Sequence, residues 1–415
     1  MKTKTSRQVC SIVWAGTISF VIVMGLGRFA FTPLLPMMLH DHVIDLQGGT
    51  FLASIHYVGY LLGALFCMLL PWLLRQCHWA IPSQSAMVRY SLVATALFIF
   101  GMSLSLPSLW PLFRCLTGVS SAVAFVYTSG WCLEQLAQLE SLSLSGVIYA
   151  GPGLGIVISG LVSIAMGSLH FSSSMAWLGF SLLAALFTGT VWNIFQADAC
   201  KAASVLETKD PFIPVQEVWK WEHILLAIAY GLAGFGYIIT ATFLPVIAHE
   251  TIPKSPWIHF FWPLFGVSVV IGALSAQKIP ITIDRRSILF WIYMMQLIGV
   301  LMPLWFPNQW GFFLGIILLG FPFNLLSLFG MQEARRLRPA ETTILMGLLT
   351  AMYGFGQILG PSVTSYFLSH TKNHAEGFSF SLRTAAASLL VGGGLYLLMK
   401  FLYPFNKTGR GKVKS

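Results

Sequence analysis

The chain has 415 residues, of which 56% are hydrophobic and only 9% are charged, whereas soluble domains carry about 25% charged residues. This composition excludes an ordinary soluble protein and predicts one that is embedded in a membrane. The net charge of +10 would suit nucleic acid if the basic residues formed one surface, so their distribution along the chain decides its meaning.

Twelve apolar runs are long enough to cross a bilayer, since a hydrocarbon core of about 30 Å needs about 20 residues per helix. In chain order they are 11–38, 50–74, 87–106, 109–132, 144–168, 174–196, 223–248, 257–279, 287–306, 310–332, 344–369 and 381–403. The first run has no small-residue cleavage site after it, so we interpret it as a retained span and not a signal peptide. The sequence therefore predicts an all-α membrane protein with twelve transmembrane helices.

The basic residues follow the positive-inside rule when the N-terminus is placed in the cytoplasm. Lys and Arg then gather at both termini, in the central loop and after spans two, eight and ten, whereas Lys254, Lys372 and Arg383 alone fall on the outer side. We therefore expect a multi-pass protein of the cytoplasmic (inner) membrane with both termini cytoplasmic. This distribution also excludes nucleic acid as a partner.

The first span contains MGLGRFAFTPLLPMM, residues 24–38, in which Arg28 interrupts an apolar helix. An arginine at the centre of a bilayer costs about 2.5–3.5 kcal/mol on insertion scales, so it should face a cavity or a partner. Thr32 lies on the same helical face, and Pro33 and Pro36 cannot donate backbone hydrogen bonds. We predict a broken helix end that borders a polar cavity, with Arg28 binding a solute; the alternative is that Arg28 only holds helices together.

Titratable groups within the spans are few. We find no Asp or Glu in the middle of any predicted span, so an anionic solute would supply the negative charge that arginine recognises. For proton coupling the candidates are His56 in span two, Glu134 at the end of span four, and the solute's own proton. His259 and His370 lie near outer ends of spans, and we favour His56 over them. An interfacial hydrogen-bonding role for His56 is the simpler alternative.

Span four contains RCLTGVSSA, in which Arg114, Gly118 and Ala122 share one helical face. The small residues allow close helix packing, and Arg114 should point inward for the same energetic reason as Arg28. Solute binding and a purely structural role are equally compatible with this pattern.

The polar stretch at 196–221 separates six spans from six. It predicts an N-terminal bundle at 1–197, a cytoplasmic linker at 198–221 and a C-terminal bundle at 222–415. GLGRFAFTPLLPMM aligns with GFGYIITATFLPVI in the second half, which places Gly25 on Gly234 and Arg28 on Tyr237. The two bundles are thus predicted to be parallel repeats.

The second half offers neutral candidates for the same cavity. These are Tyr237, Asn324 in GFPFNLLSLFG and Gln357 in span eleven. The alternative for Asn324 and Gln357 is interhelical hydrogen bonding, which contributes about 0.6 kcal/mol on average in membranes.

Two six-span repeats with cytoplasmic termini resemble the major facilitator superfamily, and residues 11–403 follow its architecture. RCLTGVSSA is similar to the arginine motif of span four, and YAGPGLGI resembles in part the antiporter motif of span five. GLGRFAF and ASIHYVGYLLGALF look like the YbfB/YjiJ-type branch. PWLLRQCHWA departs from the Asp-Arg motif that usually follows span two, whereas IDRR after span eight keeps part of it. The resemblance implies halves that rock about a site at their interface.

We therefore expect a secondary transporter for a small organic, anionic solute. The predicted solute-binding residues are Arg28, Thr32, Arg114, Tyr237, Asn324 and Gln357. A multidrug or metabolite efflux antiporter is one alternative, and a membrane sensor or assembly protein that no longer transports is another. No enzyme, cofactor or metal motif is found. The expected partners are the solute and the lipid bilayer, and we expect a monomer; the substrate, direction and coupling ion stay open.

Overall fold

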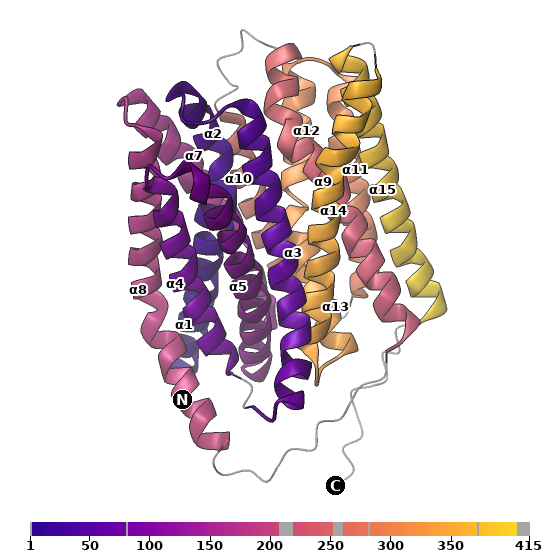
Figure 1. The fold of residues 1–415 in the computed structure, drawn as a ribbon. Helices are drawn as coiled ribbons and strands as arrows, with labels where there is room; N and C mark the ends of the chain where they lie inside the picture. The colour runs from indigo at the N-terminus through magenta and orange to yellow at the C-terminus, as the bar shows by residue number, and fades with distance from the viewer. Residues whose placement is uncertain are drawn as a thin grey trace.

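The computed structural model describes residues 2–79, 82–206, 219–251, 260–280, 283–371 and 373–404. Across this part of the chain, 12 helices are long and apolar enough to cross a membrane, and no strand is present, which confirms the predicted all-α fold (Figure 1). The helices of the first half are α1 Lys2–Phe20, α2 Phe31–His40, α3 Leu46–Gln76, α4 Gln84–Ser103, α5 Trp110–Gln138, α6 Ser145–Ile148, α7 Gly151–Ser168 and α8 Ser173–Leu206. Those of the second half are α9 Trp221–Thr251, α10 Phe261–Ser275, α11 Arg285–Trp305, α12 Gln309–Gly320, α13 Phe323–Leu337, α14 Thr342–His370 and α15 His374–Leu402.

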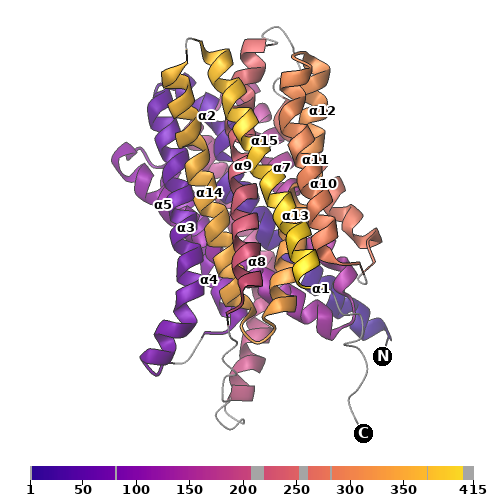
Figure 2. The same ribbon diagram turned by 90° about the vertical axis from the view of Figure 1, so that its right-hand side faces the viewer.

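The two halves stand side by side, with the start of α1 and the end of α15 toward the same end of the molecule (Figures 1 and 2). We call this the terminal end. Two pairs of helices join the halves, since α3 packs against α14 and α7 packs against α10. Half of the predicted linker at 198–221, residues 207–218, falls outside the described residues, and α8 continues into its first part as far as Leu206. The bundle boundaries stay a prediction.

Contacts between glycine backbones repeat from one half to the other. A Cβ placed on Gly25 would lie 2.3 Å from the Cα of Gly155, and one placed on Gly356 would lie 3.2 Å from the carbonyl carbon of Gly234. Gly25 aligns with Gly234, and Gly155 of YAGPGLGI aligns with Gly356 of YGFGQILGP, so these are equivalent positions in the sequence repeat. Because a side chain at either crossing would meet backbone atoms, the same close helix approach is built into both halves, which supports the parallel repeat.

The first span differs in form from the prediction. A π-helix at Val21–Phe29 connects α1 to α2, and α2 continues through Pro36 to His40. The prediction of a broken helix at the prolines is therefore wrong in position, because the distortion precedes them. π segments disturb the regular backbone bonding and are frequent at functional sites; here the Ala30 N–H donates to the Gly25 carbonyl at 2.9 Å.

The halves are also joined by hydrogen bonds at the terminal end. Arg335 at the end of α13 donates to the Leu133 carbonyl of α5. Nearby, Gln332 Nε2 donates to Ser145 Oγ at 3.1 Å. The molecule is thus held closed between its halves at this end.

Candidate functional site

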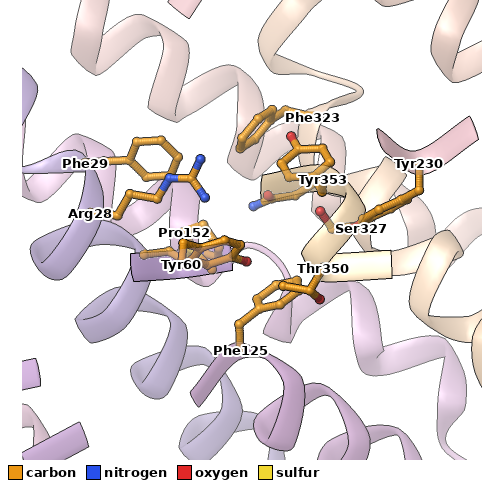
Figure 3. A pocket seen from close by; sticks show the side chains of 12 residues that line it. Arg28, Phe29, Tyr60, Phe125, Pro152, Tyr230, Phe323, Ser327, Thr350 and Tyr353 are labelled. Atoms are coloured by element: carbon orange, nitrogen blue, oxygen red, sulfur yellow. The ribbon is translucent and has the colours of Figure 1, made fainter. Parts of the chain in front are cut away.

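Arg28 lies in the π segment and is 6% exposed. Its Nη2 donates to the hydroxyl of Tyr237 in α9 at 2.8 Å. Tyr237 is the residue that takes the place of Arg28 in the sequence repeat, so two equivalent positions meet between the halves. Arg28 points inward, as the sequence predicts, and its guanidinium is directed toward the second half (Figure 3).

Aromatic rings surround this guanidinium. The Arg28 Cζ atom lies 5.1 Å from the ring centroid of Phe29, 5.4 Å from that of Tyr57 and 5.0 Å from that of Tyr60. Cations over aromatic faces at this range are attracted by the ring quadrupole, the more so when water is excluded. Among the described residues no carboxylate forms an ion pair with Arg28, and its Nε has no hydrogen-bond partner. Within the described chain the site therefore holds a cation that no carboxylate neutralises.

The second half contributes neutral polar groups. Gln357 Nε2 donates to the Tyr237 hydroxyl at 2.7 Å, and the Gln357 Oε1 atom is buried with no partner in the described structure. Tyr237 stacks on Tyr353 with ring centroids 5.6 Å apart. Asn324 Nδ2 donates to the Tyr149 carbonyl of the first half at 2.6 Å. Tyr237 thus bonds to Arg28 directly, Gln357 joins it through the Tyr237 hydroxyl, and Asn324 forms a separate bridge.

A small pocket of about 20 Å³ lies beside Arg28 at the interface of the halves. This is room for about one water molecule, so no organic solute fits in this conformation. Residues of both halves line it (Figure 3): Met24, Arg28, Phe29, Tyr60, Phe125, Pro152, Tyr230, Phe323, Asn324, Ser327, Thr350 and Tyr353.

Arg114 and His56 lie behind the site and do not line this pocket. Arg114 is 2% exposed, donates through Nη1 to the Gly27 carbonyl at 3.1 Å and lies over the Phe31 ring at 4.6 Å. His56 Nδ1 is 3.3 Å from the Arg114 carbonyl. Arg114 therefore holds the π segment in place from within the first half, whereas His56 joins α3 to α5.

Thr32 and Glu134 lie apart from the other predicted residues. Thr32 faces a second, larger cavity of about 840 Å³ at the end of the molecule away from the termini. Glu134 is exposed near the terminal end, where it accepts from Gln84 Nε2 at 3.3 Å. The structure thus gathers Arg28, Tyr237, Asn324 and Gln357 around the interface and leaves the rest at its periphery.

Sequence reasoning missed most of the aromatic residues of the site. Tyr57 and Tyr60, which come just after His56, are three residues apart, and this spacing places both tyrosines on one face of α3. That spacing in the span next to Arg28 was a usable signal. Tyr353 and Phe323 offered no comparable pattern, because apolar and aromatic residues are frequent throughout the spans.

The tyrosine hydroxyl between the halves gives a first test. Changing Tyr237 to Phe removes the shared acceptor and leaves the donors of Arg28 and Gln357 buried without it, which costs about 1–3 kcal/mol. We expect a lower melting temperature in detergent, measured by thermal unfolding of the purified chain. Tyr366→Phe, at an exposed position, is the matched control and should melt like the wild type; equal melting of both variants would contradict the assignment.

Twelve spanning helices, two repeated halves and a buried cationic site at their interface define a transmembrane transporter. The sequence matches the family described as "Uncharacterised MFS-type transporter YbfB" over residues 20–397, and the chain belongs to this family of the major facilitator superfamily. Comparison with curated proteins returned no match.

Among solved structures, the chain is similar to the human organic anion transporter MFSD10 (TETRAN). The TM-score is 0.63 at 14% sequence identity, and the match covers 95% of this chain and 99% of that one. This likeness confirms the predicted major facilitator fold.

Proposed function

We propose that the chain is a secondary active transporter that moves a small organic anion across the cytoplasmic membrane. The observation that carries the proposal is the Arg28 guanidinium, buried at the interface with no carboxylate partner among the described residues. A buried cation gains most from an anionic ligand, and arginine binds carboxylate and phosphate groups through paired hydrogen bonds. The human protein of similar fold is named as an organic anion transporter, which agrees with this chemistry.

Transport proceeds by rocking residues 1–197 against 222–415, with both termini in the cytoplasm. The contacts of Arg335 and Gln332 join the halves at the terminal end, whereas the cavity of about 840 Å³ lies at the other end. In this orientation the cavity faces away from the cytoplasm. The solute would displace Tyr237 from Arg28, and Gln357 and Asn324 would complete its hydrogen bonds.

His56 is the proposed proton carrier. Its Nδ1 atom faces the Arg114 carbonyl, and its Nε2 atom is buried with no partner in the described part of the chain. A proton on Nε2 would add a positive charge beside the site, and an anion bound at Arg28 would attract that charge. Solute binding and proton uptake would therefore favour each other.

An efflux antiporter for drugs or metabolites is the second candidate, because aromatic residues line the large cavity. Uptake of labelled carboxylates into proteoliposomes, compared with dye efflux under a pH gradient, separates the two functions. Saturable carboxylate uptake that loses its dependence on the pH gradient in His56→Gln supports the proposal. Dye efflux alone favours the antiporter, and neither flux nor ligand-dependent stabilisation favours a sensor or assembly protein.

A further inference from the structure

We propose that the large cavity is a second binding site, in which an aromatic carboxylate docks before it reaches Arg28. The inference rests on the proposed function and adds to it both a substrate class and a staging position. We call this cavity the outer site. It lies between α2, α7, α9, α10 and α12, and its lining includes Asp41, Gly160, Ser163, His170, Trp262 and Phe265.

Size distinguishes the outer site from the pocket beside Arg28. Its volume of about 840 Å³ falls within the range of about 300–1,000 Å³ that small-molecule sites occupy. The pocket beside Arg28 has only about 20 Å³. A solute that enters from this end in the observed conformation therefore meets the outer site first.

Two hydrogen-bond donors in the outer site have no partner within the described chain. Ser163 is 5% exposed and its Oγ is unpaired, and the buried Nε1 of Trp262 is unpaired as well. The two groups come from opposite halves, Ser163 from α7 and Trp262 from α10. Both atoms have almost no accessible surface, so a ligand reaches them when the two side chains turn toward the cavity. Because a buried donor without an acceptor costs about 1–3 kcal/mol, an acceptor placed there gains from both, and a carboxylate brings two acceptor oxygens.

The space around these donors depends on Gly160, one turn before Ser163 on α7. A Cβ on Gly160 would lie 3.0 Å from Cγ of Pro263 and 3.5 Å from Cδ1 of Trp262. The indole edge thus approaches α7 closely at this point. A larger residue here would fill the cavity beside the unpaired N–H group.

Stacked aromatic rings form the wall of the outer site that faces Arg28. The ring centroids of Trp262 and Phe265 are 5.7 Å apart with an interplanar angle of 24°. An aromatic ligand that packs against these rings gains about 0.5–1.5 kcal/mol per ring pair, beyond the gain from burying its apolar area. The wall therefore favours an aromatic solute over an aliphatic one of the same charge.

The same rings separate the outer site from Arg28. Phe29 lies 6.0 Å from Trp262 and 6.1 Å from Phe323, measured between ring centroids, and Phe265 lies 5.6 Å from Phe323. Phe29 and Phe323 also line the pocket beside Arg28. A solute in the outer site must displace this partition to move inward, which makes the outer site a distinct stop.

The charges at the rim do not oppose an anion strongly. Asp41 Oδ2 accepts from the Ser173 N–H at 2.6 Å, and its Oδ1 lies 3.7 Å from His40 Nδ1. Burial would raise the pKa of Asp41, but the bonds from Ser173 and His40 outweigh it and hold the pKa below its usual value. The negative charge of Asp41 is therefore already engaged, and His170 is the other titratable group at the rim.

Binding of 2-naphthoate to the purified full chain in nanodiscs tests the proposal, with decahydro-2-naphthoate as the non-aromatic counterpart. In the Arg28→Ala background, weak 2-naphthoate binding should remain and should exceed that of the decahydro compound at least twofold. Adding Ser163→Ala or Trp262→Phe should weaken it about fivefold to tenfold, and Gly160→Leu should abolish it. Trp305→Phe, at an exposed position, is the matched control and should change nothing.

Kinetics separate a staging site from the site at Arg28. With Arg28 present, Ser163→Ala and Trp262→Phe should slow 2-naphthoate association several-fold and leave the equilibrium Kd nearly unchanged. The inference is overturned if Arg28→Ala retains no binding of 2-naphthoate. It is also overturned if Ser163→Ala and Trp262→Phe change neither the association rate nor the residual binding. Carboxylate transport itself would still stand after either result. Absence of any carboxylate binding to the wild type would overturn both proposals.

Discussion

Replacing Arg28 with alanine should weaken the binding of an aromatic carboxylate about 100-fold. Truncating one partner of a buried, hydrogen-bonded charge pair costs about 2–5 kcal/mol, and about 2.8 kcal/mol corresponds to a factor of 100. Arg28 is the buried cation at the interface, and its Nη2 atom already bonds across it to Tyr237. Calorimetric titration of the purified variant with 2-naphthoate measures the loss.

Three comparisons make this result specific to the charge. Arg28→Lys keeps the charge but loses the planar pair of donors, so its affinity should fall between wild type and Arg28→Ala. Arg383→Ala removes an arginine from an exposed position and should bind normally. The neutral 2-naphthamide should lose little affinity in Arg28→Ala, and a variant that binds the anion as tightly as wild type would remove Arg28 from the site.

The architecture could be predicted because a bilayer imposes strong constraints on sequence. Apolar runs of about 20 residues must become helices, and the twelve predicted spans agree with the 12 helices of the structure. The alignment of Arg28 with Tyr237 in the repeat also corresponds to a contact in the structure, since the two side chains share a hydrogen bond. Equivalent positions of two related halves meet near the axis that relates them, so the repeat also indicated this contact.

Side-chain partners were harder to predict because they depend on how helices rotate and cross. The rule that a membrane arginine must face inward holds for both Arg28 and Arg114, yet it does not distinguish a ligand site from an internal bond. Arg114 bonds to the carbonyl of Gly27, which lies within the π segment Val21–Phe29. No residue pattern in the sequence predicted that segment. The prolines suggested a distortion of this helix, and only its position was wrong.

The two halves also differ in the groups that their buried arginines bind. In the first half the buried cations bind carbonyls, hydroxyls and rings. In the second half a network at the terminal end joins Arg286 and Arg336 to Glu222, Asp284 and Glu333. The partial IDRR motif supplies Asp284 and Arg286, so the motif kept in the sequence marks the half in which this network exists.

Replacing Arg286 with alanine should destabilise the protein by about 3–5 kcal/mol, because removing one partner leaves buried charges uncompensated. Arg286 is 1% exposed and lies 3.2 Å from Glu222 and 3.0 Å from Asp284. It also donates to the carbonyls of Met399 and Tyr403 at 3.0 and 2.6 Å, so it ties α9, α11 and α15 together. Thermal unfolding in detergent at neutral pH measures the loss.

The pH dependence of this loss identifies its electrostatic part. Burial raises the pKa of Asp284, but hydrogen bonds and charge attraction from Arg286 outweigh it and hold the pKa below its usual value. A depressed carboxyl pKa adds stability above the unfolded value of about 3.9 and loses it as pH falls through the folded value. The difference between wild type and Arg286→Ala should therefore narrow as the pH falls below about 4. Arg286→Lys should be intermediate at neutral pH, whereas equal stability of all three chains would contradict the role assigned to Arg286.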